Sequence, residues 1–347
     1  MATKKPKIVF TAPKITEGFM AHDIALLSPY VDVIELDLSM YGGFRRLFYF
    51  VALLRALLRE QARAVLCFFV MPNYTPVVVT LARVLGRKVI IVTGGIDATY
   101  VPDIGYGAMG HWLHRRLFAY SIRLAHSVLP FSNSSRDEIL RYSRPSRVRT
   151  AYLAIDTELF RPGNEPRARR AVTACYSISP GTLRRKGIDT FIQAAALLPD
   201  VEFVVVGSID QGTWAALAEQ TPPNVRFTMR RYDRHRYARL LQTSAVYVQA
   251  SAHEGFGVSL AEAMSCGCVP VVTDRYALPE VVGDTGYLAP FGDPAALAQA
   301  IQEALDHPEK GEAAHQRAVE HFPEARRQRL LREELELILG ISLAERT

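Results

Sequence analysis

Short apolar runs alternate with helical patterns along almost the whole chain, and this alternation constrains the fold more than any other feature. Many of the runs are continuous stretches of Val, Ile, Leu and Phe, which are typical of parallel strands buried on both faces. Strands that alternate with helices predict βαβ units with right-handed crossovers. The expected strands are Lys7–Thr11, Val31–Asp37, Ala64–Phe69, Val89–Thr93, Ser127–Phe131, Val172–Ser177, Val201–Val206, Val225–Thr228, Ala245–Ala250 and Val269–Thr273. Expected helices include Phe44–Arg63, His111–Leu124, Gly187–Leu198 and Val258–Ser265.

The alternation pauses once, at Thr157–Arg170 (TELFRPGNEPRARR), which is rich in Pro, Gly and charge. We expect the linker there, between an N-terminal domain of residues 1–160 and a second domain of residues 161–323. The fold class is therefore α/β, with two Rossmann-like domains of mostly parallel strands. Ligands of such sheets bind at the carboxyl ends of the strands, so two facing sheets predict a deep cleft. Residues 324–347 contain an amphipathic helix, Glu324–Leu339, which we expect to pack back on the first domain.

Composition narrows the class of protein. Of the 347 residues, 49% are hydrophobic and 22% are charged, which predicts a folded chain with a large core. The four cysteines form no CxxC pair, and this favours a reduced, cytoplasmic compartment. The net charge of +6 allows phosphorylated ligands, but no nucleic-acid-binding motif accompanies it, so we expect no nucleic acid partner. Prolines interrupt the most apolar stretch, Val65–Val84, so it does not read as a membrane span.

Two glutamates stand out after the expected strand Ala245–Ala250. Glu254 lies in a loop with Gly255 and Gly257, and Glu262 lies eight residues later on an otherwise apolar helix. Glycines let the backbone approach a ligand closely, and the start of a helix offers unpaired N–H groups to a diphosphate. A carboxylate one turn into that helix can accept hydrogen bonds from two ribose hydroxyls, and the loop carboxylate can do the same for a sugar. Two glutamates at this spacing also occur on ordinary solvated helices, but an apolar setting makes a charge costly unless it is paired or meets a ligand.

This segment resembles the E-x7-E signature of glycosyltransferase family 4, the retaining "glycosyl transferases group 1" type with the GT-B fold. Other segments are similar to that family's motifs in the same order along the chain. They are AHSVLPFS (Ala125–Ser132), YLAIDTELFRP (Tyr152–Pro162), KGID (Lys186–Asp189) and VVVG (Val204–Gly207). The similarity covers nearly all of the second half and fainter stretches of the first.

The resemblance implies a role for each matching position. Glu262 would hold the ribose hydroxyls of a nucleoside-diphosphate sugar, and Glu254 would contact the transferred sugar. Lys186 would face the diphosphate, and the backbone N–H groups of the turn would meet the donor. The residues of that turn are Phe256, Gly257 and Val258. The resemblance implies no cofactor and no metal, and no DxD-like pair is placed to bind one.

The chain departs from the family pattern before Lys186. Relatives carry a Gly-Arg pair five or six residues earlier, where this chain has Pro180 and Gly181. Either Arg184 or Arg185 can replace the missing guanidinium, with Arg185 favoured, or both can point into solvent. If neither reaches the phosphates, the chain would bind a nucleotide sugar without transferring it.

In the first half, Asp97 follows the expected strand Val89–Thr93 and a Gly-Gly pair. Similar enzymes place a His or Asp beside the reacting sugar there, so Asp97 is our third catalytic candidate, with Lys186 and Glu254. The alternative role for Asp97 is a helix cap or Asx turn. The resemblance also carries Gly18, weakly, to the donor phosphate, whereas His22 is more typical of a paired surface histidine. We interpret the segment 97–110 as an acceptor-side loop.

The expected helix Phe44–Arg63 places Arg45, Arg55, Arg59 and Arg63 beside a wide apolar arc. Such a helix can lie on an anionic bilayer, or it can be a packing helix of the first sheet with a basic edge. His114, Arg115, Arg116 and Arg123 form a second basic patch. We therefore expect a cytoplasmic protein, with peripheral contact to the inner face of the membrane as a hypothesis.

Together these features predict a metal-independent retaining glycosyltransferase of the hexosyltransferase type. The donor would be a nucleoside-diphosphate sugar, and the acceptor a glycan, lipid-linked or small molecule of the kind used in cell-envelope polysaccharide synthesis. Base recognition would lie near Met229–Arg231. Two alternatives stay open, namely a sugar-nucleotide 2-epimerase of the same fold and a non-catalytic nucleotide-sugar-binding subunit. A dehydrogenase is disfavoured because no G-x-G-x-x-G follows the first strand of either half.

Overall fold

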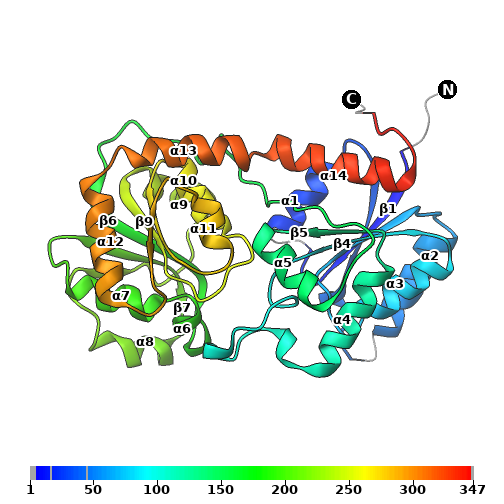
Figure 1. Ribbon diagram of the computed structural model, residues 1–347, viewed down its shortest axis with the longest axis horizontal. Coiled ribbons are helices and arrows are strands. Elements are labelled where there is room, and N and C mark those ends of the chain that lie inside the picture. The colour runs from blue at the N-terminus through cyan, green and yellow to red at the C-terminus, as the bar shows by residue number, and fades with distance from the viewer. Residues whose placement is uncertain (1–4, 16–17, 44–45, 345–347) are drawn as a thin grey trace. The chain divides into compact units, whose positions relative to one another are not determined.

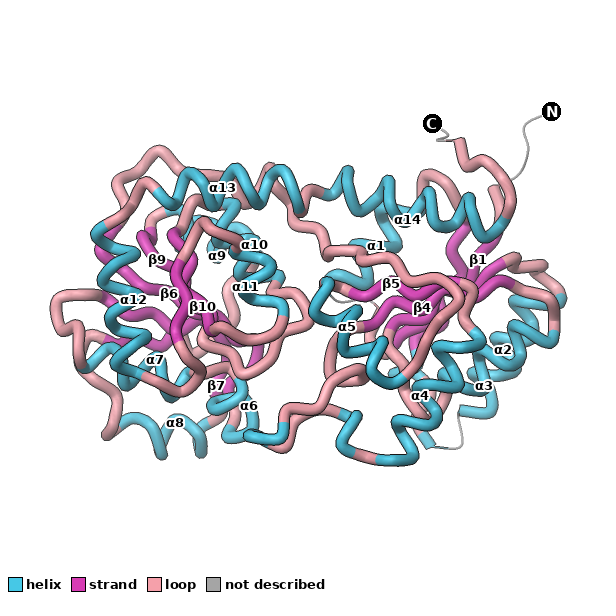
Figure 2. The backbone as a smooth tube through the Cα atoms, viewed as in Figure 1, coloured by secondary structure: helices cyan, strands magenta, loops and turns pink. Residues whose placement is uncertain are grey.

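The structure is a computed structural model that describes residues 5–15, 18–43 and 46–344. The chain divides into two compact units. The first comprises Met1–Leu153 and Glu324–Thr347, and the second is Ala154–Pro323. Each unit is a parallel sheet with helices on both faces (Figures 1 and 2). The segment 157–170, interpreted above as a linker, lies within the second unit, and its last residues already belong to a strand.

The first unit has a sheet of five parallel strands in the order β2-β1-β3-β4-β5. The strands are β1 (Lys7–Ala12), β2 (Asp32–Asp37), β3 (Ala64–Phe68), β4 (Lys88–Thr93) and β5 (Ser127–Pro130). The helices are α1 (Gly18–Leu27), α2 (Arg46–Leu58), α3 (Thr75–Val84), α4 (Trp112–Leu124), α5 (Asn133–Tyr142) and α14 (Glu324–Leu339). The strand order changes direction between β1 and β3, which is where open sheets of this kind bind ligands.

The second unit has six parallel strands in the order β11-β10-β9-β6-β7-β8. The strands are β6 (Ala168–Ile178), β7 (Glu202–Ile209), β8 (Val225–Phe227), β9 (Ser244–Gln249), β10 (Val269–Thr273) and β11 (Tyr287–Ala289). The helices are α6 (Pro180–Arg185), α7 (Ile188–Ala196), α8 (Gln211–Ala218), α9 (Arg234–Gln242), α10 (Val258–Ser265), α11 (Ala277–Val282), α12 (Pro294–Asp306) and α13 (Lys310–His321). Here the strand order changes direction between β6 and β9, and this point positions the candidate site.

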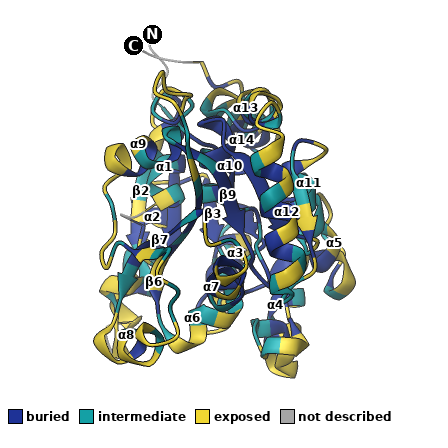
Figure 3. Cartoon of the chain, turned by 90° about the vertical axis from the view of Figure 1, so that its left-hand side faces the viewer, coloured by how far each residue is buried: buried dark blue, intermediate teal, exposed yellow. Residues whose placement is uncertain are grey.

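The continuous apolar runs form these strands because both faces of each sheet are covered. β3, β5 and β10 are buried along their whole length. Figure 3 shows β9 in dark blue, whereas the outward turns of α12 are yellow. The α/β fold class is thus confirmed, and each of the ten expected strands is found. The three-residue strand β11 was not among the strands expected from the sequence.

Helix α14 belongs to the first unit, although it follows the second in the sequence. It packs beside α1 (Figure 1). Arg327 of α14 donates to both carboxylate oxygens of Asp23 at 2.8 and 2.6 Å, and both side chains are buried. Glu334, also buried, accepts from Ser127 at 2.6 Å and from Arg147 at 2.6 and 3.1 Å. These charge-assisted bonds tie the end of the described chain to the first sheet.

Candidate active site

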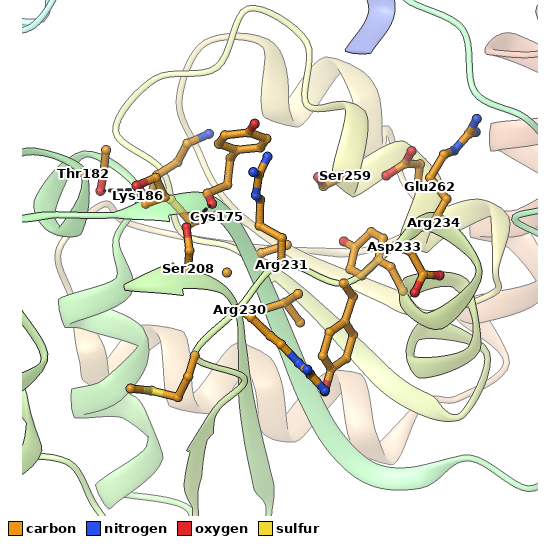
Figure 4. Close-up of a pocket in the computed structure, with 18 of the residues that line it drawn as sticks. Cys175, Thr182, Lys186, Ser208, Arg230, Arg231, Asp233, Arg234, Ser259 and Glu262 are labelled. Carbon is orange, nitrogen blue, oxygen red and sulfur yellow. Dashed lines mark hydrogen bonds between the residues drawn. The ribbon is translucent and has the colours of Figure 1, made fainter. Parts of the chain in front are cut away.

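A pocket of about 1080 Å³ opens in the second unit at the carboxyl ends of β6 and β7 (Figure 4). It lies at the change of strand direction, because its other wall comes from α10, which follows β9. Its lining includes Tyr176, Arg185, Lys186, Arg231, Tyr237 and Glu262. Figure 4 shows Lys186 and Glu262 at opposite ends, with Arg231 extending between them in this view. The pocket therefore has the cation Lys186 at one end and the carboxyl group of Glu262, with Arg234 beside it, at the other.

The turn that leads into α10 depends on a glycine. Gly257 is the cap of the helix, with a φ of +104° that a side chain rarely adopts. The ring of Phe256 is buried against Phe322, with ring centroids 5.0 Å apart. The ring of Phe256 therefore stabilises the turn by packing and is not placed to contact a ligand. Val258 begins the helix, so the three residues assigned from the sequence to backbone contact all lie where helix N–H groups start.

Glu262 lines the pocket from the second turn of α10. Its carboxyl group makes no hydrogen bond to any residue that the structure describes. Protein surrounds it on every side but the pocket, and this burial raises the pKa of Glu262 to about 8, although Arg234 acts in the opposite direction. Close by, the buried hydroxyl of Tyr237 lies near Tyr247 and Ser259 but has no hydrogen bond of good geometry within the described chain. A ligand with hydroxyl groups can satisfy these polar atoms.

Glu254 and Lys186 form an ion pair, with 2.6 Å between Lys186 Nζ and Glu254 Oε1. The same carboxylate oxygen accepts hydrogen bonds from Gln249 at 2.9 Å and Ser251 at 2.7 Å. Burial raises the pKa of Glu254, but the charge of Lys186 and these hydrogen bonds outweigh it and hold the pKa below its ordinary value. Glu254 is therefore ionised, and it fixes the ammonium group at the pocket wall.

The two arginines before Lys186 lie in different places. Arg185 lines the pocket and contributes to the low pKa of Glu254. Arg184 lies outside the pocket lining, 3.3 Å from Asp189 and 4.9 Å from the centre of the Phe291 ring. More than half of its side chain is exposed. The structure thus brings Arg185, and not Arg184, to the pocket.

The segment after β8 supplies a further cationic face. Arg231 stacks on the ring of Tyr176, with 3.8 Å from its guanidinium carbon to the ring centre. Arg230 and Met229 also line the pocket, and Met229 has a φ of +59°. A guanidinium held flat on an aromatic ring offers its edge to phosphate oxygens and its planar face to a base. Figure 4 shows that Arg230 points to a different side of the pocket from Arg231.

Asp97 lies in the first unit and is 1% exposed. Its carboxylate accepts from the N–H of Val70 at 2.7 Å, from that of Gly95 at 3.2 Å and from the hydroxyl of Thr93. Burial raises the pKa of Asp97, while the three hydrogen bonds lower it, and the net direction is upward. The side chain thus joins the ends of β3 and β4. Direct contact with an acceptor would require these loops to move.

Gly18, His22 and two segments of the first unit also carried predictions from the sequence. Gly18 is the first residue of α1, with a φ of +64° and no atom near the position of a Cβ, and its neighbours 16 and 17 lie outside the described residues. His22 pairs with Glu324 at 2.8 Å, as expected of a surface histidine. Residues 97–110 form a loop with two short 3-10 helices. In the expected helix Phe44–Arg63, residues 44 and 45 lie outside the described residues, and α2 ends at Leu58.

Two absences apply to the residues that the structure describes. Across residues 5–15, 18–43 and 46–344, no cluster of three or more His, Cys, Asp or Glu side chains is arranged to hold a metal ion. Within the same ranges, no helix has both the length and the apolar character to cross a bilayer. All four cysteines are buried and unbridged.

Sequence reasoning missed several residues of this site. Gln249 and Ser251, which donate to Glu254, are polar residues two positions apart at the end of an apolar strand. Residues two positions apart in a strand point to the same face, and this spacing could have predicted that the two side chains lie together. Tyr176 and Tyr237 carried no such signal, because their places in the pocket depend on β6 and α9 meeting in space.

The same region matches a known family. Residues 168–321 match the model of "Glycosyl transferases group 1". A curated relative, "MMP alpha-(1->4)-mannosyltransferase" of Mycolicibacterium hassiacum, is 31% identical over 210 residues, which cover 56% of this chain and 50% of the relative. This chain therefore spans about half the length of that relative.

Solved structures resemble the whole chain in fold. Sucrose-phosphate synthase from Thermosynechococcus elongatus has a TM-score of 0.77 at 18% identity, covering 97% of this chain and 100% of its own. Anabaena Alr3699/HepE, solved in complex with UDP and glucose, has a TM-score of 0.76 at 17% identity and covers 96% and 100%. At these identities the likeness shows the fold, which is the two-unit GT-B class.

Proposed function

We infer that this chain, whose residues 168–321 match the model of the glycosyl transferases group 1 family, is a retaining glycosyltransferase of family 4 type. It would move a hexose-type sugar from a nucleoside-diphosphate sugar to a glycan, lipid-linked or small-molecule acceptor. One observation carries the proposal. The pocket of the second unit is lined by Arg185 and Lys186, and Figure 4 shows Glu262, whose carboxyl group makes no hydrogen bond to a described residue, at the end opposite Lys186. A diphosphate flanked by a sugar and a ribose needs such an arrangement.

The donor is placed by charge. The diphosphate lies at Lys186 and Arg185, beside the start of α10, where helix N–H groups and the turn Phe256–Val258 favour an anion. The ribose lies at Glu262, whose carboxylate accepts from two vicinal hydroxyls. Glu254 contacts the transferred sugar, and it holds the Lys186 side chain in place through the 2.6 Å ion pair. The solved complex of a protein of the same fold with UDP and glucose supports a donor of this kind.

The chemistry follows from the position of the cations. As the bond from sugar to diphosphate breaks, negative charge grows on the leaving phosphate. A cation and a phosphate about 4 Å apart attract by about 4 kcal/mol at an effective dielectric near 20, before desolvation. The attraction strengthens with that charge, so Lys186 and Arg185 stabilise the transition state more than the ground state. They supply the charge neutralisation for which other transferases use a metal ion, and we propose transfer without metal or cofactor. The acceptor attacks from the face that the diphosphate leaves, and the phosphate takes its proton.

On the acceptor side we assign Asp97 a positioning role, because its carboxylate is buried and holds the loops after β3 and β4. The acceptor-side loop 97–110 begins at this residue. Gly18, at the start of α1, remains a weaker candidate for phosphate contact. We also propose that this enzyme is cytoplasmic and takes part in cell-envelope polysaccharide synthesis. It would touch the inner face of an anionic membrane through α2.

Calorimetry with UDP- and GDP-sugars, followed by product analysis, tests the proposal. We expect one sugar nucleotide to bind the wild type, and Glu262→Ala to weaken that binding at least tenfold, since it removes about two hydrogen bonds to a charged group. The product formed with an acceptor should keep the anomeric configuration of the donor. Unchanged affinity in Glu262→Ala would refute the ribose role. Conversion of the donor without acceptor would indicate an epimerase, and binding without turnover across an acceptor panel would indicate a binding subunit.

A further inference from the structure

A second hollow, away from the donor pocket, lies on the first unit between α4 and the end of α5. It has a volume of about 670 Å³. We call it the α4 groove, and it is lined by Arg115, Arg116, Ala119, Tyr120, Arg123, Leu124 and Tyr142. Arg115, Ala119 and Arg123 follow one another at four-residue steps, so they share one face of α4. No acidic residue lines the groove.

The three guanidinium groups of the groove lack counter-charges. Arg115, Arg116 and Arg123 are exposed, and none of them forms an ion pair within the described residues. Arg115 lies 6.0 Å from the centre of the Tyr142 ring, and Arg116 lies 5.8 Å from that of Trp112. The aromatic rings orient the cations but do not neutralise them. Three like charges that line one groove repel one another, so an anion that bridges them lowers the free energy.

The helices around the groove also lack acidic residues. Helices α2, α3 and α4 contain no Asp or Glu at all. They nevertheless expose large apolar side chains: Leu47, Phe48, Val51 and Leu58 on α2, Val77 and Val84 on α3, and Trp112, Leu113 and Tyr120 on α4. Adjacent pairs of these helices are in contact, and side chains from all three enter one core cluster. Basic helices that contain no acidic residue and expose Trp, Phe and Leu have the composition of a surface that lies on anionic lipid.

We propose that the α4 groove is a binding site for the phosphate headgroup of an anionic phospholipid. The guanidinium groups of Arg116 and Arg123 bind the phosphate oxygens. Trp112 and Leu113, beside the groove, enter the headgroup region. A soluble nucleic acid would not use these apolar side chains, and a free phosphate would not either, so the lipid is the occupant that accounts for both observations. The inference extends the membrane contact proposed above for α2 and is independent of the transfer reaction.

Sedimentation of the full chain with vesicles tests the groove. Phosphatidylcholine vesicles are compared with vesicles that also contain phosphatidylglycerol. We expect binding to the anionic vesicles alone, and the double variant Arg116→Gln, Arg123→Gln to bind about 30-fold more weakly, since each basic residue at such a surface counts for about a factor of five to ten. The matched control, Arg239→Gln with Arg329→Gln, makes the same charge change at exposed positions outside the layer and should bind like the wild type.

A spectroscopic measurement locates the contact. The chain has two tryptophans, so a Trp214→Phe variant leaves Trp112, beside Arg116, as the one reporter. Its emission should shift to the blue with anionic vesicles and stay unchanged with neutral ones. An unshifted emission, or equal binding by the groove variant and the control, would overturn the groove.

Further outcomes separate the groove from the α2 contact and from other ligands. If Arg55→Gln with Arg59→Gln weakens vesicle binding and the groove variant does not, the α2 contact is supported and the lipid site in the groove is refuted. If neither pair of substitutions weakens vesicle binding, both membrane proposals are refuted, while the proposed sugar transfer is unaffected. Binding of glycerol 3-phosphate to the free protein as tight as binding to anionic vesicles, at equal ionic strength, would identify a soluble phosphate as the ligand. Binding to an oligonucleotide as tight as to vesicles would identify a polyanion. Both of these results also contradict the lipid proposal.

Discussion

Glu254 and Glu262 are chemically identical and eight positions apart, but their surroundings drive their pKa values in opposite directions. Glu254 meets Lys186, Ser251 and Gln249, so its pKa falls. Glu262 is buried and makes no hydrogen bond to a described residue, so its pKa rises to about 8. At neutral pH the first is an anion that holds a cation, whereas the second carries a proton until a ligand arrives. The different protonation states of the two glutamates therefore depend on the neighbours of each carboxyl group.

Donor binding is expected to release a proton at neutral pH. Ribose hydroxyls donate to the ionised form of Glu262, so the bound state lowers its pKa from about 8. The free protein holds the proton below about pH 8, and affinity should therefore rise with pH, by at most about tenfold per unit, and level off above that value. Calorimetry with a nucleotide sugar in buffers of different ionisation enthalpy measures the proton. Glu262→Gln should bind weakly without releasing it, and an undiminished pH dependence in that variant would exclude Glu262 as the source.

Lys186→Met should lose stability as well as donor affinity. It leaves the largely buried carboxylate of Glu254 without its cation, and breaking a pair of this kind costs about 2 to 4 kcal/mol in the free energy of unfolding. Adding Glu254→Gln to Lys186→Met should restore most of the stability but not the binding of the diphosphate. Urea unfolding and calorimetry measure the two effects separately. Recovery of both in the double variant would mean that Lys186 serves the fold alone.

At the scale of elements, the donor pocket depends on how closely the turn between α6 and α7 approaches the end of β9. Gly187 has a φ of +63°, and a Cβ at this position would lie 1.9 Å from the carbonyl oxygen of Ala250. The neighbouring backbone is tied as well, since the N–H of Ala252 donates to the carbonyl oxygen of Arg185 at 2.8 Å. A glycine therefore lets the strand end and the helix pair meet, and this contact brings Lys186 to Glu254.

Gly187→Ala should destabilise the second unit by about 3 kcal/mol or more, because the clash is with backbone that cannot rotate away. Gly181→Ala is the matched control. Gly181 lies in α6 with nothing within 4 Å of its Cβ position, so alanine there should be neutral or stabilise by up to about 1 kcal/mol. Denaturant unfolding of both variants gives the comparison. Equal stabilities would show that the α6–α7 turn does not need glycine.

At the scale of the whole molecule, the chain returns to its first unit after completing the second. The Asp23–Arg327 pair joins residues 304 positions apart, and both side chains are at most 3% exposed. The donor pocket, in contrast, is built from residues 160–262 within the second unit. Stability of the first unit and binding of the donor should therefore be separable.

Arg327→Met is expected to cost about 3 to 5 kcal/mol in stability, since it leaves Asp23 buried without a partner. Its affinity for the nucleotide sugar at low temperature should equal that of the wild type. Arg329→Met, at an exposed position of the same helix, should change stability by less than about 0.5 kcal/mol. Scanning and titration calorimetry give both quantities. A large loss of donor affinity in Arg327→Met would show that the pocket requires the first unit.

Local signals in the sequence, namely the apolar period and the helix ends, were enough to predict the α/β class, ten of the eleven described strands and the bounds of α10 and α14. The sequence also predicted that Glu262 and Lys186 lie together, and both line one pocket, since residues after parallel strands gather at one edge of a sheet. Which partner each of them meets depends on the tertiary structure. The pairing of Lys186 with Glu254, the absence of a partner for Glu262, the choice of Arg185 over Arg184 and the burial of Asp97 depend on contacts between segments far apart in the chain. Local sequence patterns do not encode such contacts, whereas packing fixes them.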